Sequence, residues 1–319
     1  MEMGTRVRSK KAEHQKQRAL ARRSWGIYVM MLPGLVVVLL FAYLPMFGIT
    51  MAINDFNPIF GVAGFWKSEW VGFKWFTKFI DSFYFARIMG NTLIINLLKL
   101  AFGFWVPILF ALLLNEERNT RIRKTVQTVS YLPHFISWVV GIALMQALFS
   151  PTNGMLNQIR ASMGLAPIYY MGVPEYFYAM IIGSSIWKTF GWSSIIYLAA
   201  ISGISSEMYE AAVIDGCSRI KQAWYITLPT IRPLIVMLLL LNIGGMLGSD
   251  FEQIFNYLGD NARLYPIGDV IDTYVYRVGL TQFQLSYGAA VGLFRGVIAL
   301  ALLGGANMIA KRAGEEGLY

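Results

Sequence analysis

The sequence predicts an all-α membrane protein with about six transmembrane helices. Of its 319 residues, 56% are hydrophobic and 14% are charged, whereas about a quarter of the residues of a soluble protein are charged. Apolar runs of about twenty residues recur along the chain, and each can cross the hydrocarbon core of a bilayer. One cysteine, Cys217, and two histidines argue against a disulfide framework and against metal chemistry.

Six apolar segments are the expected spans, and charged or turn-rich segments separate them. The spans cover residues 26–50, 91–114, 129–149, 177–202, 233–249 and 287–310. The fifth span is the shortest. Prolines fall inside several spans, namely Pro33, Pro45, Pro107 and Pro133. Neighbouring helices can satisfy the backbone groups that a proline leaves unbonded, so we expect kinks without a functional role.

The basic residues orient the spans. Eight Lys and Arg residues precede Ser24, and others follow the second, fourth and sixth spans. The remaining connecting segments, taken together, have no basic excess. The positive-inside rule therefore places both termini in the cytoplasm. The tail is expected to flank a retained span, since no basic folded domain for nucleic acid follows it and no signal-peptide cleavage site is evident.

This pattern divides the chain into three parts. A basic cytoplasmic tail covers residues 1–24, a transmembrane domain covers 25–310, and a short cytoplasmic tail covers 311–319. The external segment 51–90 is rich in aromatic residues and is expected to form interfacial or short amphipathic structure. No soluble catalytic domain is expected.

The segment 203–232, between spans four and five, is too polar to lie in hydrocarbon. Its sequence indicates two short helices that meet at a turn. Ser205 or Ser206 can cap the first helix, and Gly216 can end it, because glycine tolerates a left-handed conformation. Such a pair would protrude into the cytoplasm as a rigid corner, which suits the docking of another protein.

The second helix of this corner is expected to run from Ser218 to Leu228-Pro229. Ser218 can cap its start, and the proline would stop it. Asp215 and Arg219 are four residues apart, and we expect them to stabilise the corner.

A spaced motif runs through the same segment. It consists of Glu-Ala-Ala, three residues, Gly, nine residues, and Ile-x-Leu-Pro. Its defining positions are Glu210, Ala211, Ala212, Gly216, Ile226, Leu228 and Pro229. The motif resembles the EAA motif of the permease subunits of binding-protein-dependent ATP-binding-cassette importers. Cys217 stands where that family commonly has alanine, and the residue is still small. The resemblance implies the type I importer permease fold.

The resemblance also implies a division of labour. The corner would be the coupling site for a separate ATPase, formed by Glu210, Ala211, Ala212, Asp215, Gly216, Leu228 and Pro229. Glu210 would make a polar contact with the ATPase, the two alanines would allow close approach, and Gly216 would set the shape of the turn. The chain has no Gly-x-x-x-x-Gly-Lys-Ser/Thr loop, so ATP would be bound by partner subunits and no cofactor by the chain itself.

Two further segments narrow the class of importer. Residues 131–138 and 269–277, together with the end of the chain from Asn307, look like carbohydrate permeases that import oligosaccharides released from polysaccharides. The resemblance implies that this chain forms half of the translocation pathway. The implied partners are a second and distinct permease, an ATPase dimer, an extracellular sugar-binding lipoprotein, the oligosaccharide and membrane lipid, with no nucleic acid.

A sugar path should combine hydrogen-bonding groups with aromatic rings. The candidates within the spans are Asn96, Lys99, Trp187, Lys188, Trp192, Asn242 and Arg295. Lipid-facing packing is the alternative for each aromatic residue. Basic residues inside spans are costly unless they face water or a partner. They would either favour an anionic, uronate-containing sugar, or snorkel and pair with carbonyls and carboxylates such as Asp250.

Two other classes of protein are weighed against the importer subunit. A membrane-embedded enzyme would need a catalytic set, yet no His-Glu-x-x-His motif is present and His134 has no assignable nucleophile partner. A self-sufficient secondary transporter or channel would explain the spans and the buried charge. It has no need of the motif in segment 203–232, so the sequence favours a non-catalytic permease subunit.

Overall fold

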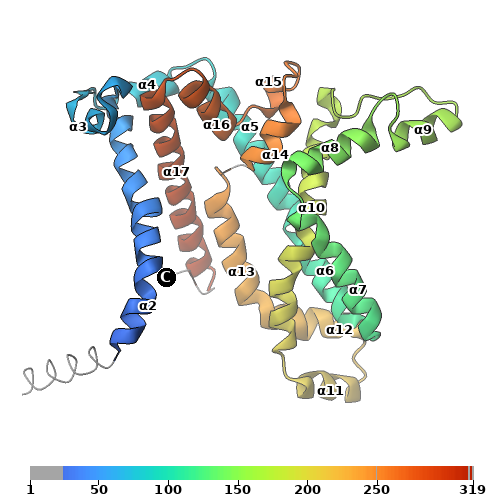
Figure 1. Ribbon diagram of the computed structural model, residues 1–319. Coiled ribbons are helices and arrows are strands. Elements are labelled where there is room, and N and C mark those ends of the chain that lie inside the picture. The colour runs from blue at the N-terminus through green and yellow to red at the C-terminus, as the bar shows by residue number, and fades with distance from the viewer. Residues whose placement is uncertain (1–23, 249, 315–316, 318–319) are drawn as a thin grey trace, which may run out of the picture.

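A computed structural model describes residues 24–248, 250–314 and 317 of the chain. Its long helices run between two ends of the molecule (Figure 1). Short helices and a small hairpin gather at one end, and α11 (Ser206–Ile214) protrudes at the other. The predicted N-terminal tail, except Ser24, and most of the tail after Gly314 lie outside the described residues.

Four continuous helical segments in the described part are long and apolar enough to span a membrane. They are Trp25–Ala52, Phe85–Glu116, Arg219–Gly245 and Leu285–Arg312. Their component helices are α2 (Trp25–Val38), η1 (Leu39–Tyr43), η2 (Leu44–Ala52), α5 (Phe85–Leu98), η4 (Lys99–Gly103), α6 (Trp105–Glu116), α12 (Arg219–Gln222), η6 (Ala223–Thr227), α13 (Leu228–Gly245) and α17 (Leu285–Arg312). They correspond to the first, second, fifth and sixth predicted spans.

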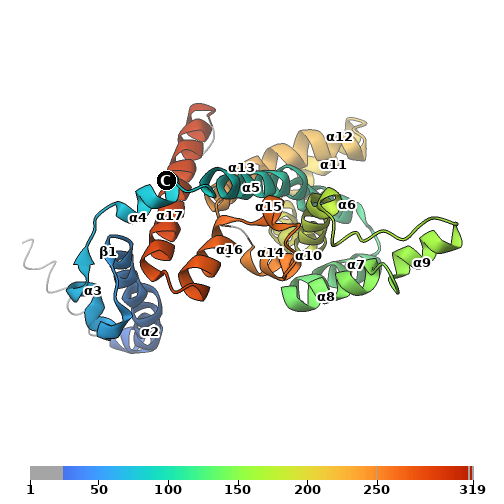
Figure 2. The same cartoon turned by 90° about the horizontal axis from the view of Figure 1, so that it is seen from above.

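The fourth predicted span is α10 (Pro174–Ser202), a helix of 29 residues. It is long enough to cross a membrane but is more polar than the four segments above, because it carries Lys188, Thr189 and several serines. Seen from above (Figure 2), α10 lies in the middle of the molecule, with α2 at one side and α8 (Trp138–Phe149) at the other. The helix therefore packs among its neighbours at the centre of the fold.

The third predicted span, 129–149, is wrong as a single helix. The chain runs through α7 (Thr120–Tyr131) and η5 (Leu132–Phe135), then bends by 106° into α8. The bend has a local cause. Ile136 and Ser137 both adopt extended backbone conformations, and the Ser137 Oγ caps α8 by accepting a hydrogen bond from the Val140 N–H at 3.4 Å.

Three of the spans contain a short π-helical segment one turn before a proline. A proline ring in a helix clashes with the carbonyl four residues earlier. For Pro45, Pro107 and Pro229 that earlier residue lies within η1, η4 and η6. The wider turn accommodates the ring, and the helix continues. The expected stop at Leu228-Pro229 is therefore wrong, and the fifth span begins well before the predicted residue 233.

The end opposite α11 is built from short elements. Strands β1 (Asn54–Asp55) and β2 (Glu69–Trp70) pair antiparallel, with Asn54 opposite Trp70 and Asp55 opposite Glu69. The other elements in the described part are η3 (Pro58–Ala63), α3 (Gly64–Lys67), α4 (Lys74–Ile80), α9 (Met155–Ser162), α14 (Phe251–Leu258), α15 (Tyr265–Gly268), α16 (Ile271–Val275) and η7 (Tyr276–Thr281). Segment 51–90 is thus short structure, as expected, but it includes a two-stranded hairpin in an otherwise helical fold.

Close helix packing fixes the middle of the bundle. A Cβ atom at Gly191 of α10 would come within 2.1 Å of the Ser130 carbonyl oxygen of α7, so only glycine fits at this crossing. A buried apolar cluster joins α6, α10 and α13 and includes Ile108, Tyr197 and Ile231. These contacts hold α6, α10 and α13 together where they enclose the cavity described below.

Candidate functional site

The protruding corner is capped at both ends of α11. The Ser205 Oγ accepts a hydrogen bond from the Glu207 N–H at 3.3 Å, which confirms one of the two predicted capping serines. At the other end Gly216 has a φ of 73°, which confirms the predicted left-handed turn. The Gly216 N–H donates to the Val213 carbonyl at 3.0 Å, and the Cys217 N–H donates to the Ala212 carbonyl at 2.8 Å. This pair of bonds is a Schellman motif, which gives the turn one fixed shape.

Three contacts tie the corner to the membrane helices. The Tyr209 hydroxyl lies 2.9 Å from the Thr227 Oγ1, which joins α11 to η6. The Arg219 guanidinium forms an ion pair with Glu116 at the end of α6, at 3.4 Å. The buried Gln222 side chain donates to the Cys217 carbonyl at 3.2 Å. Corner and bundle are therefore connected through two spans, not through one flexible loop.

The sequence did not predict these tethers. Arg219 pairs with Glu116, which is 103 residues away along the chain. It does not form an ion pair with Asp215 in the described part of the chain, although both residues are predicted to stabilise the corner. Ser218 begins α12 but its side chain makes no capping bond. No local signal marks Glu116 or Tyr209, because both partners depend on how distant helices pack.

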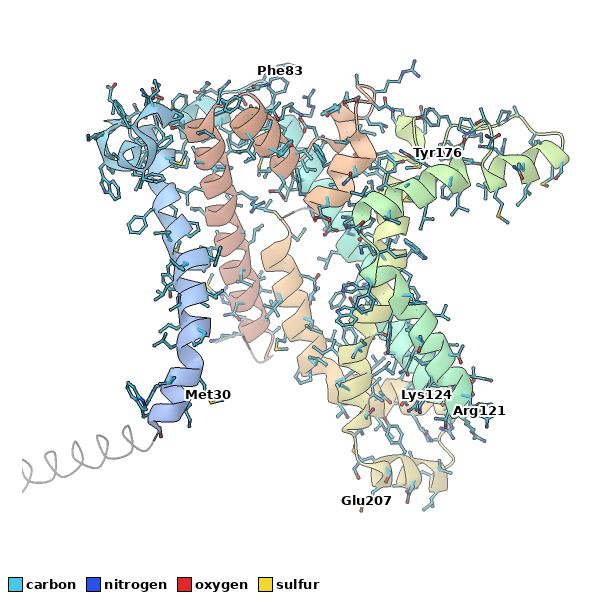
Figure 3. The ribbon with its side chains drawn as sticks, in the orientation of Figure 1. Met30, Phe83, Arg121, Lys124, Tyr176 and Glu207 are labelled. Atoms are coloured by element: carbon cyan, nitrogen blue, oxygen red, sulfur yellow. The ribbon has the colours of Figure 1, made fainter. Side chains whose placement is uncertain are left out.

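The outer surface of the corner is open to solvent. Glu210, Ala211 and Asp215 are exposed, Ala212 is half-buried, and Glu207 lies at the far end of the molecule (Figure 3). Large apolar side chains share this polar end, with Ile214 86% and Tyr225 77% exposed. Exposed apolar groups beside charged ones are typical of a protein-docking surface. Leu228 and Pro229 lie in the first turn of α13, away from the tip.

A cavity of about 910 Å³ lies between the spans. Its walls come from α5, η4 and α6 on one side and from α10 and α13 on the others. Because η4 occupies the middle of the Phe85–Glu116 segment, the cavity lies at membrane depth. Four of the candidate path residues line it, namely Asn96, Lys99, Trp192 and Asn242. Trp187, Lys188 and Arg295 are not among its lining residues.

Lys99 is a basic residue in the lining of the cavity. Its ammonium donates to the Asp250 carboxylate at 2.8 Å and to the Gln253 side-chain oxygen at 2.6 Å. The lysine side chain is 13% exposed and the aspartate side chain 51% exposed. Asp250 also lines the cavity, so this pair contributes balanced charge and hydrogen-bonding groups instead of net positive charge.

Two amides and one aromatic ring complete the polar lining. Asn96 and Asn242 each donate to the carbonyl four residues earlier, at 2.8 Å. An amide side chain has a second N–H and an oxygen that can bond to a ligand. Trp192 is held by a parallel stack with His134, whose ring centroid lies 4.6 Å away. A fixed indole beside polar groups is suited to a sugar, because rings stack and amides bond to hydroxyls.

Lys188 is bound to backbone carbonyl groups. Its ammonium donates to the carbonyl of His134 at 2.8 Å, to that of Pro133 at 3.5 Å and, more closely, to that of Ile136. These carbonyls lie at the end of η5, where the chain breaks before α8 and helical partners are missing. A cation at the C-terminal end of a helix also meets the negative end of the helix dipole. Lys188 thereby stabilises the bend between η5 and α8.

Arg295 of α17 pairs with Asp272 of α16, at the end of the molecule away from the corner. Trp187 is 39% exposed and lies outside the cavity lining. The structure thus brings four of the seven path candidates together and places the other three elsewhere. Of the three basic candidates, only Lys99 reaches the cavity.

A bundle of apolar helices around a polar cavity, with a protruding corner tethered to the cavity wall, is the arrangement expected of the membrane component of a transport system. Residues 103–312 match the family "Binding-protein-dependent transport system inner membrane component". The chain belongs to this family. It is therefore a multi-pass inner-membrane permease subunit, and it is not the subunit that hydrolyses ATP.

Three similar proteins illustrate the relationship. The polygalacturonan/rhamnogalacturonan transport system permease protein YteP of Bacillus subtilis (strain 168) is 44% identical over 293 residues, which is 92% of this chain and 90% of that protein. Protein LplB of the same organism is 42% identical over 301 residues, covering 94% and 93%. A chain of the bacterial alginate ABC transporter, solved with an alginate-pentasaccharide-bound periplasmic protein, has 38% identity, a TM-score of 0.82 and coverage of 93% and 98%.

Proposed function

We propose that this chain forms half of the translocation pathway of an ATP-driven importer for uronate-containing oligosaccharides. A separate ATPase dimer would supply the energy through the corner around α11. A second, distinct permease would complete the pathway, and an extracellular sugar-binding lipoprotein would deliver the substrate. The chain itself would bind neither ATP nor another cofactor.

One observation carries the coupling part of this proposal. The helical segment that leaves the corner runs from Arg219 to Gly245 without interruption and is 27 residues long. At 1.5 Å per residue this is about 40 Å of helix. Asn242 and Gly245, near its far end, line the cavity. A displacement of the corner can therefore reach the cavity wall through a continuous helical segment.

The mechanism would be a rigid-body switch. Closure of the ATPase on ATP would draw the corner inward, and the tethers Tyr209–Thr227 and Arg219–Glu116 would move α13 and α6 with it. Those two helices form walls of the cavity, so their movement would change the side from which the cavity opens. The fixed Schellman turn supports this role, because a flexible corner would absorb the movement.

The basic residues support a cytoplasmic position for the corner. Arg121 and Lys124 of α7 lie at the same end of the molecule as Glu207 (Figure 3). Basic residues near span ends are typical of the cytoplasmic side. Both termini and the ATPase would then lie on that side, and the binding protein would dock at the end that carries α4 and α16.

The proposed substrate class is supported by the relatives and by the cavity. One relative is named for polygalacturonan and rhamnogalacturonan transport, and the solved neighbour imports the acidic polysaccharide alginate. The cavity offers the amides and the fixed indole that sugars need. Its lysine is balanced by Asp250, so a preference for acidic sugars would have to come from other groups as well.

Reconstituted transport tests this function. Proteoliposomes with the complete transporter and its binding protein are supplied with labelled trigalacturonate and, separately, maltotriose. We expect uptake of trigalacturonate that stops when ATP is removed and survives collapse of ion gradients. Glu210→Ala should lower uptake about tenfold, the effect of losing one charge-assisted contact, while Glu207→Ala, one turn earlier, should change it little.

Uptake that persists without ATP and follows an ion gradient would contradict the proposal. It would support the alternative, a self-sufficient secondary transporter. Uptake of maltotriose in place of trigalacturonate would keep the importer and overturn the uronate assignment. Normal membrane insertion of each variant has to be checked first, because a misfolded variant would also lose transport.

A further inference from the structure

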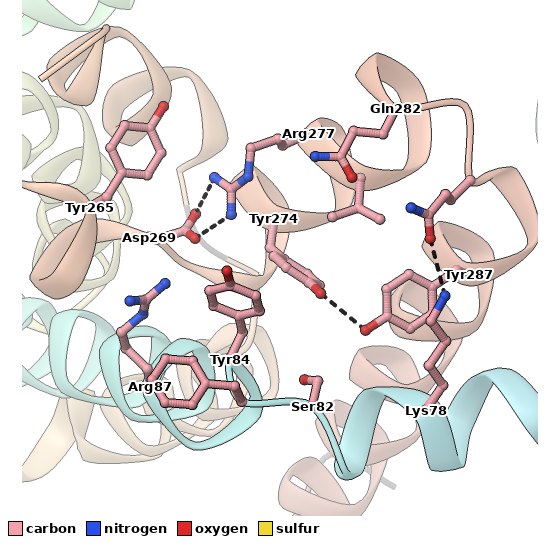
Figure 4. Close-up of a pocket in the computed structure, with 13 residues that line it drawn as sticks. Lys78, Ser82, Tyr84, Arg87, Tyr265, Asp269, Tyr274, Arg277, Gln282 and Tyr287 are labelled. Carbon is pink, nitrogen blue, oxygen red and sulfur yellow. Dashed lines mark hydrogen bonds and ion pairs between the residues drawn. The ribbon is translucent and has the colours of Figure 1, made fainter. Parts of the chain in front are cut away.

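A second cavity lies at the end of the molecule away from the corner. It has a volume of about 730 Å³ and is separate in its lining residues from the cavity between the spans. α4, the start of α5, the segment from α15 to η7, and the start of α17 enclose it (Figure 4). Its volume falls within the range of about 300–1,000 Å³ that is usual for small-molecule sites. The permease function derived above does not use it.

The pocket is positively charged. Its lining includes three cations, Lys78, Arg87 and Arg277, against one carboxylate, Asp269. Arg277 and Asp269 neutralise each other through two hydrogen bonds, at 2.6 and 3.1 Å, and Asp269 is fully buried. Within the described residues, Lys78 and Arg87 form no ion pair with a carboxylate. Two positive charges of the lining therefore remain uncompensated.

Both of these cations are already oriented by neighbouring rings. The Lys78 ammonium lies 4.7 Å from the ring centroid of Tyr287 and donates a hydrogen bond to the Gln284 side-chain oxygen at 3.3 Å. The Arg87 guanidinium lies 5.0 Å from the ring centroid of Tyr84. The Arg87 Nε is buried and finds no hydrogen-bond partner among the described residues. A buried donor without a partner is costly, so an acceptor supplied by a ligand would stabilise it.

Tyrosine rings form much of the remaining wall. Tyr84, Tyr265, Tyr274 and Tyr287 all line the pocket, and the hydroxyls of Tyr274 and Tyr287 lie 3.0 Å apart. Burial and the bond to Tyr287 raise the pKa of Tyr274, so its hydroxyl stays neutral and does not cancel the positive charge. Aromatic faces with hydroxyl groups at their edges are suited to sugar rings.

We propose that this pocket is a second binding site for the substrate, a capture site that holds an acidic oligosaccharide before it enters the membrane cavity. Figure 4 places Arg87 and Lys78 at opposite sides of the pocket, with Tyr84 and Tyr274 between them. This separation suits a chain that carries a carboxylate on more than one sugar unit, and it suits a single small anion less well. The inference deepens the proposed function and rests on it.

The site would supply the preference for acidic sugars that the membrane cavity lacks. In the cavity, Lys99 is matched by Asp250, whereas in the pocket Lys78 and Arg87 have no matching carboxylate. The competing occupant is an acidic surface of the binding protein, which would dock at this end of the molecule. A concave wall of rings favours an oligosaccharide, and the experiment distinguishes the two.

Calorimetric titration of the complete transporter in nanodiscs, without binding protein, tests the proposal. The probes are trigalacturonate and the neutral maltotriose. Lys78→Met should weaken trigalacturonate binding about tenfold, the loss of one charge-assisted hydrogen bond, and leave maltotriose binding unchanged. Lys74→Met is the matched control, because Lys74 lies one turn earlier on α4 and pairs with Asp55 outside the pocket. The affinity of Lys74→Met for trigalacturonate should stay within about twofold of that of the wild type.

Arg87→Gln provides a second, independent variant and should also weaken trigalacturonate binding. Equal affinities in the wild type and in Lys78→Met, or no binding by the wild type, would overturn the proposal. The proposal would also be overturned if Lys78→Met weakened the association of the transporter with the binding protein and left the sugar affinity unchanged, because the pocket would then receive the binding protein. ATP-driven uptake by the wild type tells a failure of the capture-site proposal from a failure of the importer proposal. If the wild type imports the sugar but Lys78→Met does not change the binding affinity, only the capture site is refuted. If the wild type does not import the sugar, the importer function is refuted.

Discussion

Replacing Lys188 by methionine tests whether this residue supports the fold or contacts the substrate. Methionine keeps most of the length and apolar character of the side chain and removes the ammonium. The carbonyls of His134 and Ile136 then lose their hydrogen-bond donor at the 106° bend between η5 and α8. Water cannot replace that donor within hydrocarbon, so the bend should become less stable.

The structure sets the size of the effect. Hydrogen bonds between membrane helices average about 0.6 kcal/mol and reach about 1.7 kcal/mol. The two bonds of Lys188 come from a charged donor, so each should lie toward the upper end of this range. We therefore expect the free energy of unfolding to fall by about 2–3 kcal/mol. If each kcal/mol lowers the melting temperature by about 2–4 °C, the midpoint should fall by roughly 4–12 °C.

Thermal unfolding of the purified permease, followed by fluorescence, measures this shift. Lys311→Met is the control, because Lys311 is an exposed lysine in the last turn of α17, and its loss should leave the midpoint unchanged. Trigalacturonate uptake by Lys188→Met should fall no further than the loss of folded permease explains. A midpoint like that of the wild type, together with a selective loss of trigalacturonate uptake, would refute the structural role and place Lys188 on the sugar path.

Two further predictions concern the packing and the charge of the bundle. Gly191→Ala should separate α10 from α7, because the new Cβ would approach the Ser130 carbonyl oxygen to 2.1 Å, and the melting temperature should fall by several degrees. Gly183→Ala is the control and should leave the melting temperature unchanged, because the space around Gly183 is open. Lys99→Gln and Asp250→Asn should each lower the stability of the permease. A double-mutant cycle should give a coupling energy of about 1 kcal/mol or less, since the aspartate side chain is 51% exposed. Strictly additive effects of the two substitutions would show that the ion pair is not formed.

Hydropathy was sufficient to locate the first, second, fifth and sixth spans, because each must bury about twenty apolar residues. It could not locate their interruptions. The bend at Ile136 and Ser137 falls within an apolar stretch, and both halves read as one span. Pro229 predicts a helix stop, because nothing in the sequence marks the π-helical segment that accommodates its ring.

The corner could be predicted because its signals are local. Ser205, Gly216 and the residues between them act within one short helix, and the structure places both caps there. The tether from Arg219 to Glu116 joins residues far apart in the chain and could not be foreseen. The same holds for the charged pocket at the other end, which several separate segments assemble. The sequence analysis marks two of these segments for other reasons: segment 51–90 for its aromatic residues, which fit an interfacial segment, and segment 269–277 for its resemblance to carbohydrate permeases.

The number of sugars imported per ATP hydrolysed, measured for two variants of Gly216, tests the central claim most directly. Asparagine tolerates the left-handed conformation that Gly216 adopts at a φ of 73°, whereas a β-branched valine does not. If energy enters through a rigid corner, Gly216→Asn should keep nearly the wild-type ratio, and Gly216→Val, inserted normally, should hydrolyse ATP with little import. Wild-type import per ATP in Gly216→Val would contradict the account.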